Sequence, residues 1–144
     1  MALPPELVDR HVGAGMNDHL RGDIDFQCRL ALFGRPTVGW LHPVGTNSSA
    51  SQVDRVRHMI TLYKEFVRPW QADGRIYHHT ISPGEPDLGW GVLEEVSKNR
   101  RQAVIGLFRL DGSGRPDYVV RPRGLDAGFR YRASRWTMQA TGLS

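Results

Sequence analysis

The sequence predicts a mixed α+β fold in which an α/β segment over residues 1–70 is followed by an antiparallel β domain over residues 71–144. Three observations lead to this fold class. One long helical pattern occupies residues 51–70. An apolar run and a loop precede it, in the order typical of α/β proteins. After Trp70 the chain consists of short alternating segments separated by turn residues, which is typical of antiparallel sheets.

Residues 51–70 form the only long amphipathic helical pattern in the chain. Apolar side chains recur there at steps of three and four residues, which places them on one face of a helix. Ser51 is in the position of an N-cap, and Asp54 three residues later resembles a weak capping box. Proline disfavours the helical conformation of the residue before it, so Arg68 and Pro69 are expected to end the helix. The apolar positions are Val53, Val56, Ile60, Tyr63, Val67 and Trp70.

A buried parallel strand is predicted before this helix. Residues 30–33, Leu-Ala-Leu-Phe, are a continuous apolar run closed by Gly34, which fits a strand covered on both faces. Residues 38–41 are a second short apolar segment, and residues 42–49 have the composition of a loop. Strand, loop and helix in this order predict an α/β unit.

Short strands are predicted throughout the second half of the chain. No helical period appears after Trp70, and glycine-rich turns separate the apolar segments. Phe129, Tyr131 and Ala133 alternate with arginine, which predicts a strand with one buried and one solvent-facing side. The expected strands cover residues 75–81, 89–96, 103–110, 118–122, 129–133 and 136–139. Together they predict an antiparallel sheet or sandwich.

Composition narrows the classes of protein that the chain can represent. It has no run of about 18 apolar residues, so no membrane span is predicted. The first residues lack the pattern of a signal peptide, so a cytoplasmic location is expected. The single cysteine, Cys28, predicts no internal disulfide and is interpreted as a small buried hydrophobe. Residues 98–144 carry a net charge of +7, but their arginines are spread along strand patterns, which favours solvated strand faces over a nucleic-acid surface.

A loop rich in glycine and hydrogen-bonding side chains begins at His11 and runs His-Val-Gly-Ala-Gly-Met-Asn-Asp-His. The spacing of His11, Asp18 and His19 matches no standard metal site. These side chains are better suited to hydrogen bonds with hydroxyl groups or with the backbone of a turn. The adjacent His78 and His79 would point to opposite faces of a strand, which argues against a shared ion. No metal and no cofactor is therefore predicted.

The order of several short motifs resembles the late barrel and the C-terminal domain of the melibiase family of α-galactosidases. The motifs are His11-Val-Gly-Ala, Arg29-Leu-Ala-Leu-Phe-Gly34, the helix end Tyr63-Lys-Glu-Phe-Val-Arg68, and Arg123-Gly-Leu-Asp126 followed by Tyr131. Their order and spacing carry the resemblance, which covers most of residues 10–132. It implies that residues 1–70 are the end of a (β/α)8 barrel and that residues 71–144 are an antiparallel β-sandwich-like domain.

The resemblance also implies a reaction, the retaining hydrolysis of terminal α-galactosides by two carboxylates. The family's nucleophile motif, Lys-x-Asp-x-Asn, does not occur in this sequence. Three carboxylates near the first loop, Asp18, Asp23 and Asp25, lie outside the family's catalytic context and are interpreted as loop and capping residues. The catalytic pair is therefore expected upstream in a longer protein, and this chain alone is expected to be inactive. Loops after barrel strands form the catalytic face, so the residues expected at the rim of the sugar site are His11, Asn17 and His19.

A free-standing carbohydrate-binding β module is the alternative interpretation. Tryptophan rings can stack on sugars, although the helical and strand positions of Trp70 and Trp90 favour core packing. The four tryptophans are Trp40, Trp70, Trp90 and Trp136. The expected partner is a carbohydrate under either interpretation. Without earlier barrel strands, residues 30–33 would expose an apolar edge, so the chain is expected to be poorly soluble or to form homo-oligomers.

Overall fold

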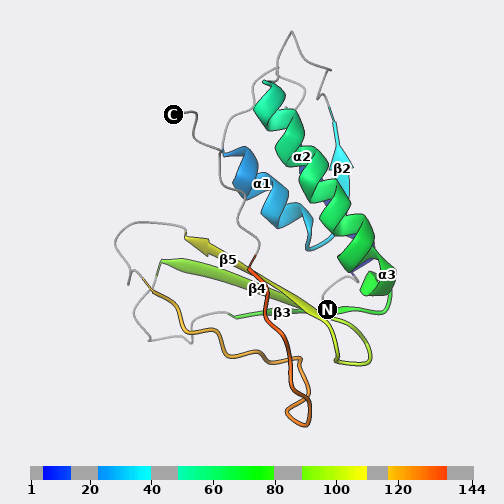
Figure 1. Ribbon diagram of the computed structural model, residues 1–144, viewed down its shortest axis with the longest axis vertical. Coiled ribbons are helices and arrows are strands. Elements are labelled where there is room, and N and C mark those ends of the chain that lie inside the picture. The colour runs from blue at the N-terminus through cyan, green and yellow to red at the C-terminus, as the bar shows by residue number, and fades with distance from the viewer. Residues whose placement is uncertain (1–4, 14–22, 40–48, 80–88, 110–116, 136–144) are drawn as a thin grey trace.

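The computed structural model describes residues 5–13, 23–39, 49–79, 89–109 and 117–135. Within them the chain has a mixed α+β fold with two sheets. In chain order the elements are a 3-10 turn (Pro5–Leu7), β1 (Asp9–Val12), α1 (Ile24–Ala31), β2 (Arg35–Val38), α2 (Ala50–Leu62), a π-helical turn (Tyr63–Val67), α3 (Arg68–Gln71), β3 (Arg75–His78), β4 (Trp90–Val96) and β5 (Ala103–Arg109). The antiparallel sheet β3-β4-β5 lies below the helices in Figure 1.

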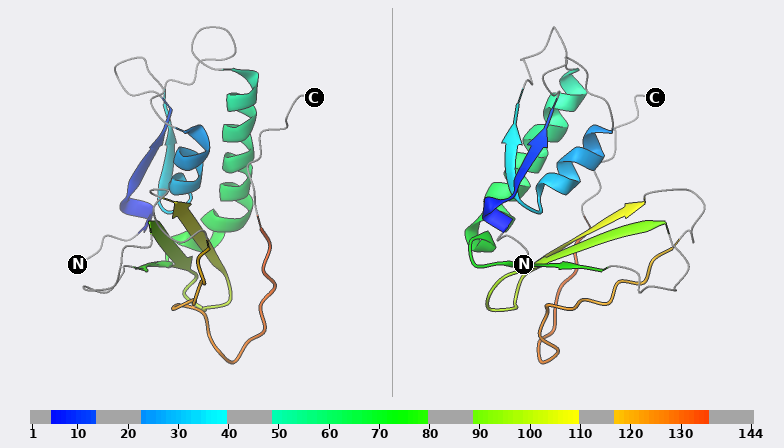
Figure 2. Two further views of the ribbon diagram at one scale, coloured as in Figure 1. Left: turned by 90° about the vertical axis from the view of Figure 1, so that its left-hand side faces the viewer. Right: turned by 180° about the vertical axis from the view of Figure 1, so that it is seen from behind.

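The strands β1 and β2 pair in parallel, and α1 connects them. Helix α1 lies on one face of the pair and α2 lies beside α1 (Figure 2). The C-terminal ends of β1 and β2 approach each other so closely that a Cβ at Gly13 would lie 2.1 Å from the carbonyl oxygen of Gly39. The φ of Gly13 is also +124°, a region that side chains rarely adopt. A glycine is therefore required where the two parallel strands end.

The strand predicted at residues 30–33 is wrong, because these residues end α1 and form the turn after it. The four-residue apolar run is part of a longer helical period in which Ile24, Cys28 and Ala31 are buried. Short apolar runs do not distinguish a buried strand from a buried helix face. Leu32 and Phe33 are buried, so the apolar edge expected there is not exposed. Strand β2 instead begins at Arg35, before the second segment predicted at residues 38–41.

The predicted long helix is confirmed over residues 50–71, with two differences. Its N-cap is Ser49 rather than Ser51, and Ser49 forms a capping box with Gln52. Pro69 does not end the helix, because a π-helical turn precedes it and α3 continues to Gln71. Proline is tolerated in the first turn of a helix, where its missing N–H is not needed. Among the described segments, no helix has the length and apolarity needed to span a bilayer.

The predicted antiparallel strands are confirmed for β3, β4 and β5, which pair in sequence order. The strands predicted at residues 118–122 and 129–133 are wrong. Residues 117–135, here called the strap, contain no strand. They run below the sheet, on the side away from the helices, and then turn back up past it (Figure 1). Most strap residues are exposed, and the described segments contain no second antiparallel sheet, so the predicted sandwich is not seen in them. The strand predicted at residues 136–139 lies outside the described residues.

One hydrophobic core joins the helices to the antiparallel sheet. Phe33 packs edge-on against Phe108, with ring centroids 6.2 Å apart. A Cβ at Gly106 would lie 2.6 Å from the Phe33 ring, so the ring fills the space that a side chain on β5 would need. The buried cluster comprises Val12, Ile24, Cys28, Ala31, Leu32, Phe33, Val56, Met59, Leu62, Val67 and Phe108. It contains side chains from both halves of the chain.

Candidate functional site

The face of the β1–β2 pair that is turned away from α1 carries four polar side chains. Parallel partners in the register point to the same face, and Asp9 is paired with Arg35 and His11 with Thr37. The opposite face contains Val12, which is buried in the core. The face with the polar residues is not covered by any helix or strand among the described residues (Figure 2).

Asp9 is the centre of this polar group. Its Oδ1 accepts a short hydrogen bond from the Thr37 hydroxyl, and its Oδ2 lies 2.8 Å from Nε2 of His11. The guanidinium of Arg35 lies 3.9 Å from Oδ1. The Thr37 hydrogen bond is the largest cause that lowers the pKa of Asp9, and the nearby His11 and Arg35 lower it further against partial desolvation. Asp9 is therefore ionised at neutral pH.

These side chains supply the donors and acceptors that bind hydroxyl groups. An ionised carboxylate accepts only, arginine donates only, and threonine and histidine do both. In the part of the chain that the structure describes, no group of three or more His, Cys, Asp or Glu side chains is placed to hold a metal ion. The arrangement suits the binding of a polar ligand with several hydroxyls.

Of the three predicted site residues, the structure places His11 on this face. Asn17 and His19 lie outside the described residues. Sequence reasoning missed Asp9 and Thr37. Only Asp9 had a local signal, the alternation of the segment Asp-Arg-His-Val, in which polar residues two positions apart lie on one face of a strand.

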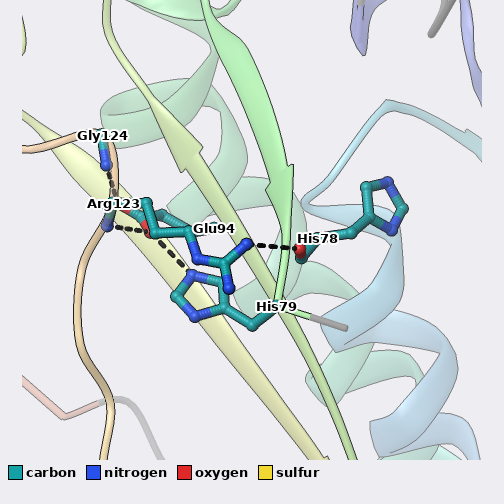
Figure 3. A network of polar contacts seen from close by, with 5 residues as sticks. All are labelled: His78, His79, Glu94, Arg123 and Gly124. Carbon is teal, nitrogen blue, oxygen red and sulfur yellow. Dashed lines mark hydrogen bonds and ion pairs between the residues drawn. The ribbon is translucent and has the colours of Figure 1, made fainter. Parts of the chain in front are cut away.

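A second polar cluster lies on the antiparallel sheet, where Glu94 is fully buried. Its Oε2 lies 2.8 Å from Nε2 of His79 and accepts the backbone N–H of Arg123 at 2.8 Å. Its Oε1 accepts the N–H of Gly124 at 2.9 Å (Figure 3). Burying a carboxylate is costly unless it is paired and hydrogen-bonded. Glu94 meets this condition by binding the strap to the sheet.

The strap is held from a second side by Arg100. Its guanidinium donates to the carbonyl oxygens of Gly124 and Leu125, at 2.7 and 3.0 Å. The Tyr131 hydroxyl donates to the carbonyl oxygen of Arg100 at 2.8 Å and accepts the N–H of Asp126 at 2.9 Å. Side chains thus satisfy the strap backbone at residues 123–126, which lie between the two predicted strands.

Glu95, the neighbour of Glu94, is also fully buried and points to the opposite face of β4. Its Oε2 accepts from Nε2 of Gln71 at 3.3 Å, and the side-chain Oε1 of Gln71 accepts from the Tyr63 hydroxyl at 2.8 Å. Burial raises the pKa of Tyr63, and the charge of Glu95 raises it further. This network connects the π-helical turn and α3 to the sheet.

These buried groups have structural roles. His79 is 8% exposed and bound to Glu94, whereas His78 is exposed, which confirms that the two histidines lie on opposite faces. Asp23 caps α1, which confirms its interpretation as a capping residue. Asp25 lies in the first turn of α1, is buried and pairs with Arg55 at 3.1 Å, so its interpretation as a solvated loop residue is wrong. Asp18 lies outside the described residues.

Cys28 is confirmed as a buried hydrophobe. It is fully buried in the core, and burial is the main cause that raises its pKa to about 11. A thiol nucleophile needs a lowered pKa and access to substrate, and Cys28 has neither.

Comparison with known proteins gives no match: no family model fits the chain, and neither a curated protein nor a solved structure resembles it significantly.

Proposed function

We propose that the chain is the C-terminal part of an α-galactosidase-like glycoside hydrolase. In this proposal the catalytic carboxylates belong to an upstream part of a longer protein, and the chain alone is inactive. The observation that carries the proposal is the parallel unit β1-α1-β2 followed by α2 and then by an antiparallel sheet. This is the order expected where a (β/α)8 barrel ends and a C-terminal β domain begins.

The parallel pairing of β1 and β2 is evidence that they belong to a larger sheet. All-parallel sheets occur almost only with both faces covered, and a two-stranded sheet alone is marginally stable. Here α1 covers one face, as helices cover the outside of a barrel. The face with Asp9, His11 and Thr37 would then point toward the barrel interior, where its polar side chains are unlike the branched apolar residues of a purely structural core.

The position of the polar residues along the strands also fits a barrel active site. Such sites lie at the C-terminal ends of the strands. His11 and Thr37 are each one residue from the last residue of their strand, and the loops that follow would form the rim of the site. In this proposal His11, with Asn17 and His19 from the following loop, binds sugar hydroxyls and performs no covalent step.

Two measurements test the proposal. The 144-residue chain should not hydrolyse an aryl α-galactoside, because it contains no Lys-x-Asp-x-Asn motif. The longer product of the same reading frame should contain this motif and should hydrolyse the α-galactoside but not the matching β-galactoside. Robust turnover by the short chain would contradict the placement of the carboxylates. A longer product without the motif and without activity would contradict the function itself.

A carbohydrate-binding module without catalysis is the second candidate, and one aromatic cluster favours it. Trp90 and Tyr118 lie with ring centroids 6.3 Å apart, and the guanidinium of Arg109 lies 6.0 Å from the Trp90 centroid. Trp70 instead packs against the core and against Phe66, and Trp40 and Trp136 lie outside the described residues. Retention of the chain on galactomannan resin, lost in Trp90→Ala, would support this candidate over the first.

A further inference from the structure

We propose that Asp9 is a positioning residue that fixes His11, so that Nδ1 of the imidazole accepts a hydrogen bond from a pyranose hydroxyl. This inference rests on the proposed carbohydrate function of the β1–β2 face. Asp9 does not touch the sugar and acts through His11. Thr37 holds Asp9 in place from the neighbouring strand.

The hydrogen bonds assign the protons. An ionised carboxylate has no proton to donate, so Nε2 of His11, 2.8 Å from Oδ2 of Asp9, must be the donor. In a neutral imidazole one nitrogen donates and the other accepts. Whenever the imidazole is neutral, Nδ1 of His11 therefore carries the lone pair. The contact to Asp9 therefore leaves Nδ1 as the nitrogen that faces a ligand, and it makes Nδ1 a hydrogen-bond acceptor.

Thr37 fixes the orientation of the Asp9 carboxylate. The Thr37 hydroxyl donates to Oδ1 of Asp9, so each carboxylate oxygen has its own partner and the carboxylate cannot rotate without losing both bonds. Thr37 and His11 are register partners on adjacent strands, and Asp9 is two residues before His11 on the same face. The backbone itself thus places the three side chains together.

Stability alone does not account for this arrangement. The His11 side chain is 71% exposed, and at such an exposed position even a charged pair stabilises a folded protein by only about 0–1 kcal/mol. In the barrel of the proposed function this face would be covered, and the covered faces of parallel sheets are usually apolar. Departures from such a local rule concentrate at functional sites. A ligand that uses the oriented imidazole explains why this face departs from it.

The test is nitrogen-detected NMR of the histidine rings in the 144-residue chain, with methyl α-D-galactopyranoside as the probe. In the unmodified chain, at a pH at which the ring nitrogen signals show His11 to be neutral, we expect its Nε2–H tautomer and a shift of its ring signals on addition of the sugar. In Asp9→Ala we expect both tautomers and an affinity about three- to tenfold weaker, the effect of one lost hydrogen bond. Asp54→Ala is the matched control, because Asp54 is an exposed carboxylate paired with Arg57 on α2.

The two ideas fail in different ways. If Asp9→Ala keeps both the tautomer and the affinity of the unmodified chain, Asp9 does not position His11. If the sugar leaves the His11 ring signals unchanged both in the 144-residue chain and in the longer product of the same reading frame, the carbohydrate function of this face is contradicted. The tautomer comparison decides the role of Asp9 in either case. A Thr37→Val variant should show a weaker form of the Asp9→Ala effect, and an unchanged tautomer in both variants would overturn the inference.

Discussion

At the scale of single residues, the buried carboxylate of Glu94 determines whether the strap stays on the sheet. Glu94→Gln keeps the shape of the side chain but replaces one acceptor oxygen by an NH2 group that faces donors. We expect the free energy of unfolding to fall by about 1–3 kcal/mol, the cost of leaving buried donors unsatisfied. Urea unfolding measures this loss, and amide hydrogen exchange should become faster at Arg123 and Gly124.

The matched control is Glu65→Gln, which makes the same change at an exposed position. It should alter stability by less than about 0.5 kcal/mol, as surface substitutions do. Equal exchange rates at Arg123 and Gly124 in Glu94→Gln and in the unmodified chain would show that the Glu94 carboxylate does not hold the strap.

Because of Cys28, the free energy of unfolding is expected to fall at alkaline pH. Burial raises its pKa from an ordinary value of 9.0 to about 11, so the folded state holds the proton more tightly than the unfolded state. The resulting stability is fully present below pH 9 and is lost as pH rises toward 11. A shift of this size corresponds to roughly 2–3 kcal/mol.

Unfolding by urea at a series of alkaline pH values measures this loss, and Cys28→Ala should show a shallower slope. Part of the slope should remain in that variant, because the pKa of Tyr63 is also raised by burial. Identical slopes with and without Cys28 would contradict the prediction.

At the scale of elements, the structure shows which of two serines near the start of α2 is its N-cap. Ser49 accepts the N–H of Gln52 and Gln52 accepts the N–H of Ser49, whereas Ser51 is an exposed residue of the first turn. Ser49→Ala should destabilise the chain by about 0.5–2 kcal/mol. Ser51→Ala should be neutral or slightly stabilising, since alanine is the better helix former. Thermal unfolding compares the two, and a larger loss in Ser51→Ala would place the cap where the sequence first suggested.

Elements with a local periodicity are predictable from the sequence, whereas those determined by distant residues are not. The long helix and the strands β3 to β5 follow from local periodicity, and they are found within a few residues of their expected bounds. The run at residues 30–33 was misassigned because four apolar residues carry no period of their own. The strap has a real alternation, but it forms no strand, and its backbone at Arg123 and Gly124 is bound by side chains distant in sequence, which no local pattern reveals. Asp9 and Thr37 meet only through strand pairing across 28 residues, which no local pattern reveals.

At the scale of the whole molecule, the two halves of the sequence share one core. Phe108 on β5 is 5% exposed and packs against Phe33 after α1 and against Phe26 on α1, with centroids 6.2 and 5.2 Å away. The Gln71–Glu95 bond joins α3 to β4 at the same seam. Residues 1–70 and 71–144 are therefore expected to unfold together rather than as separate domains.

Phe108→Ala tests this coupling. Removing a buried phenylalanine costs about 3–5 kcal/mol, and a shared core transmits that loss to both halves. The helical circular-dichroism signal and the tryptophan fluorescence should shift to lower urea concentration together and with the same midpoint. Phe66→Ala, at a side chain that is 37% exposed, should cost less than half as much. If the helical signal of Phe108→Ala keeps its original midpoint while the fluorescence shifts, the helices are stable without the sheet. The helical part would then be an independent unit, as a boundary at residue 70 would require.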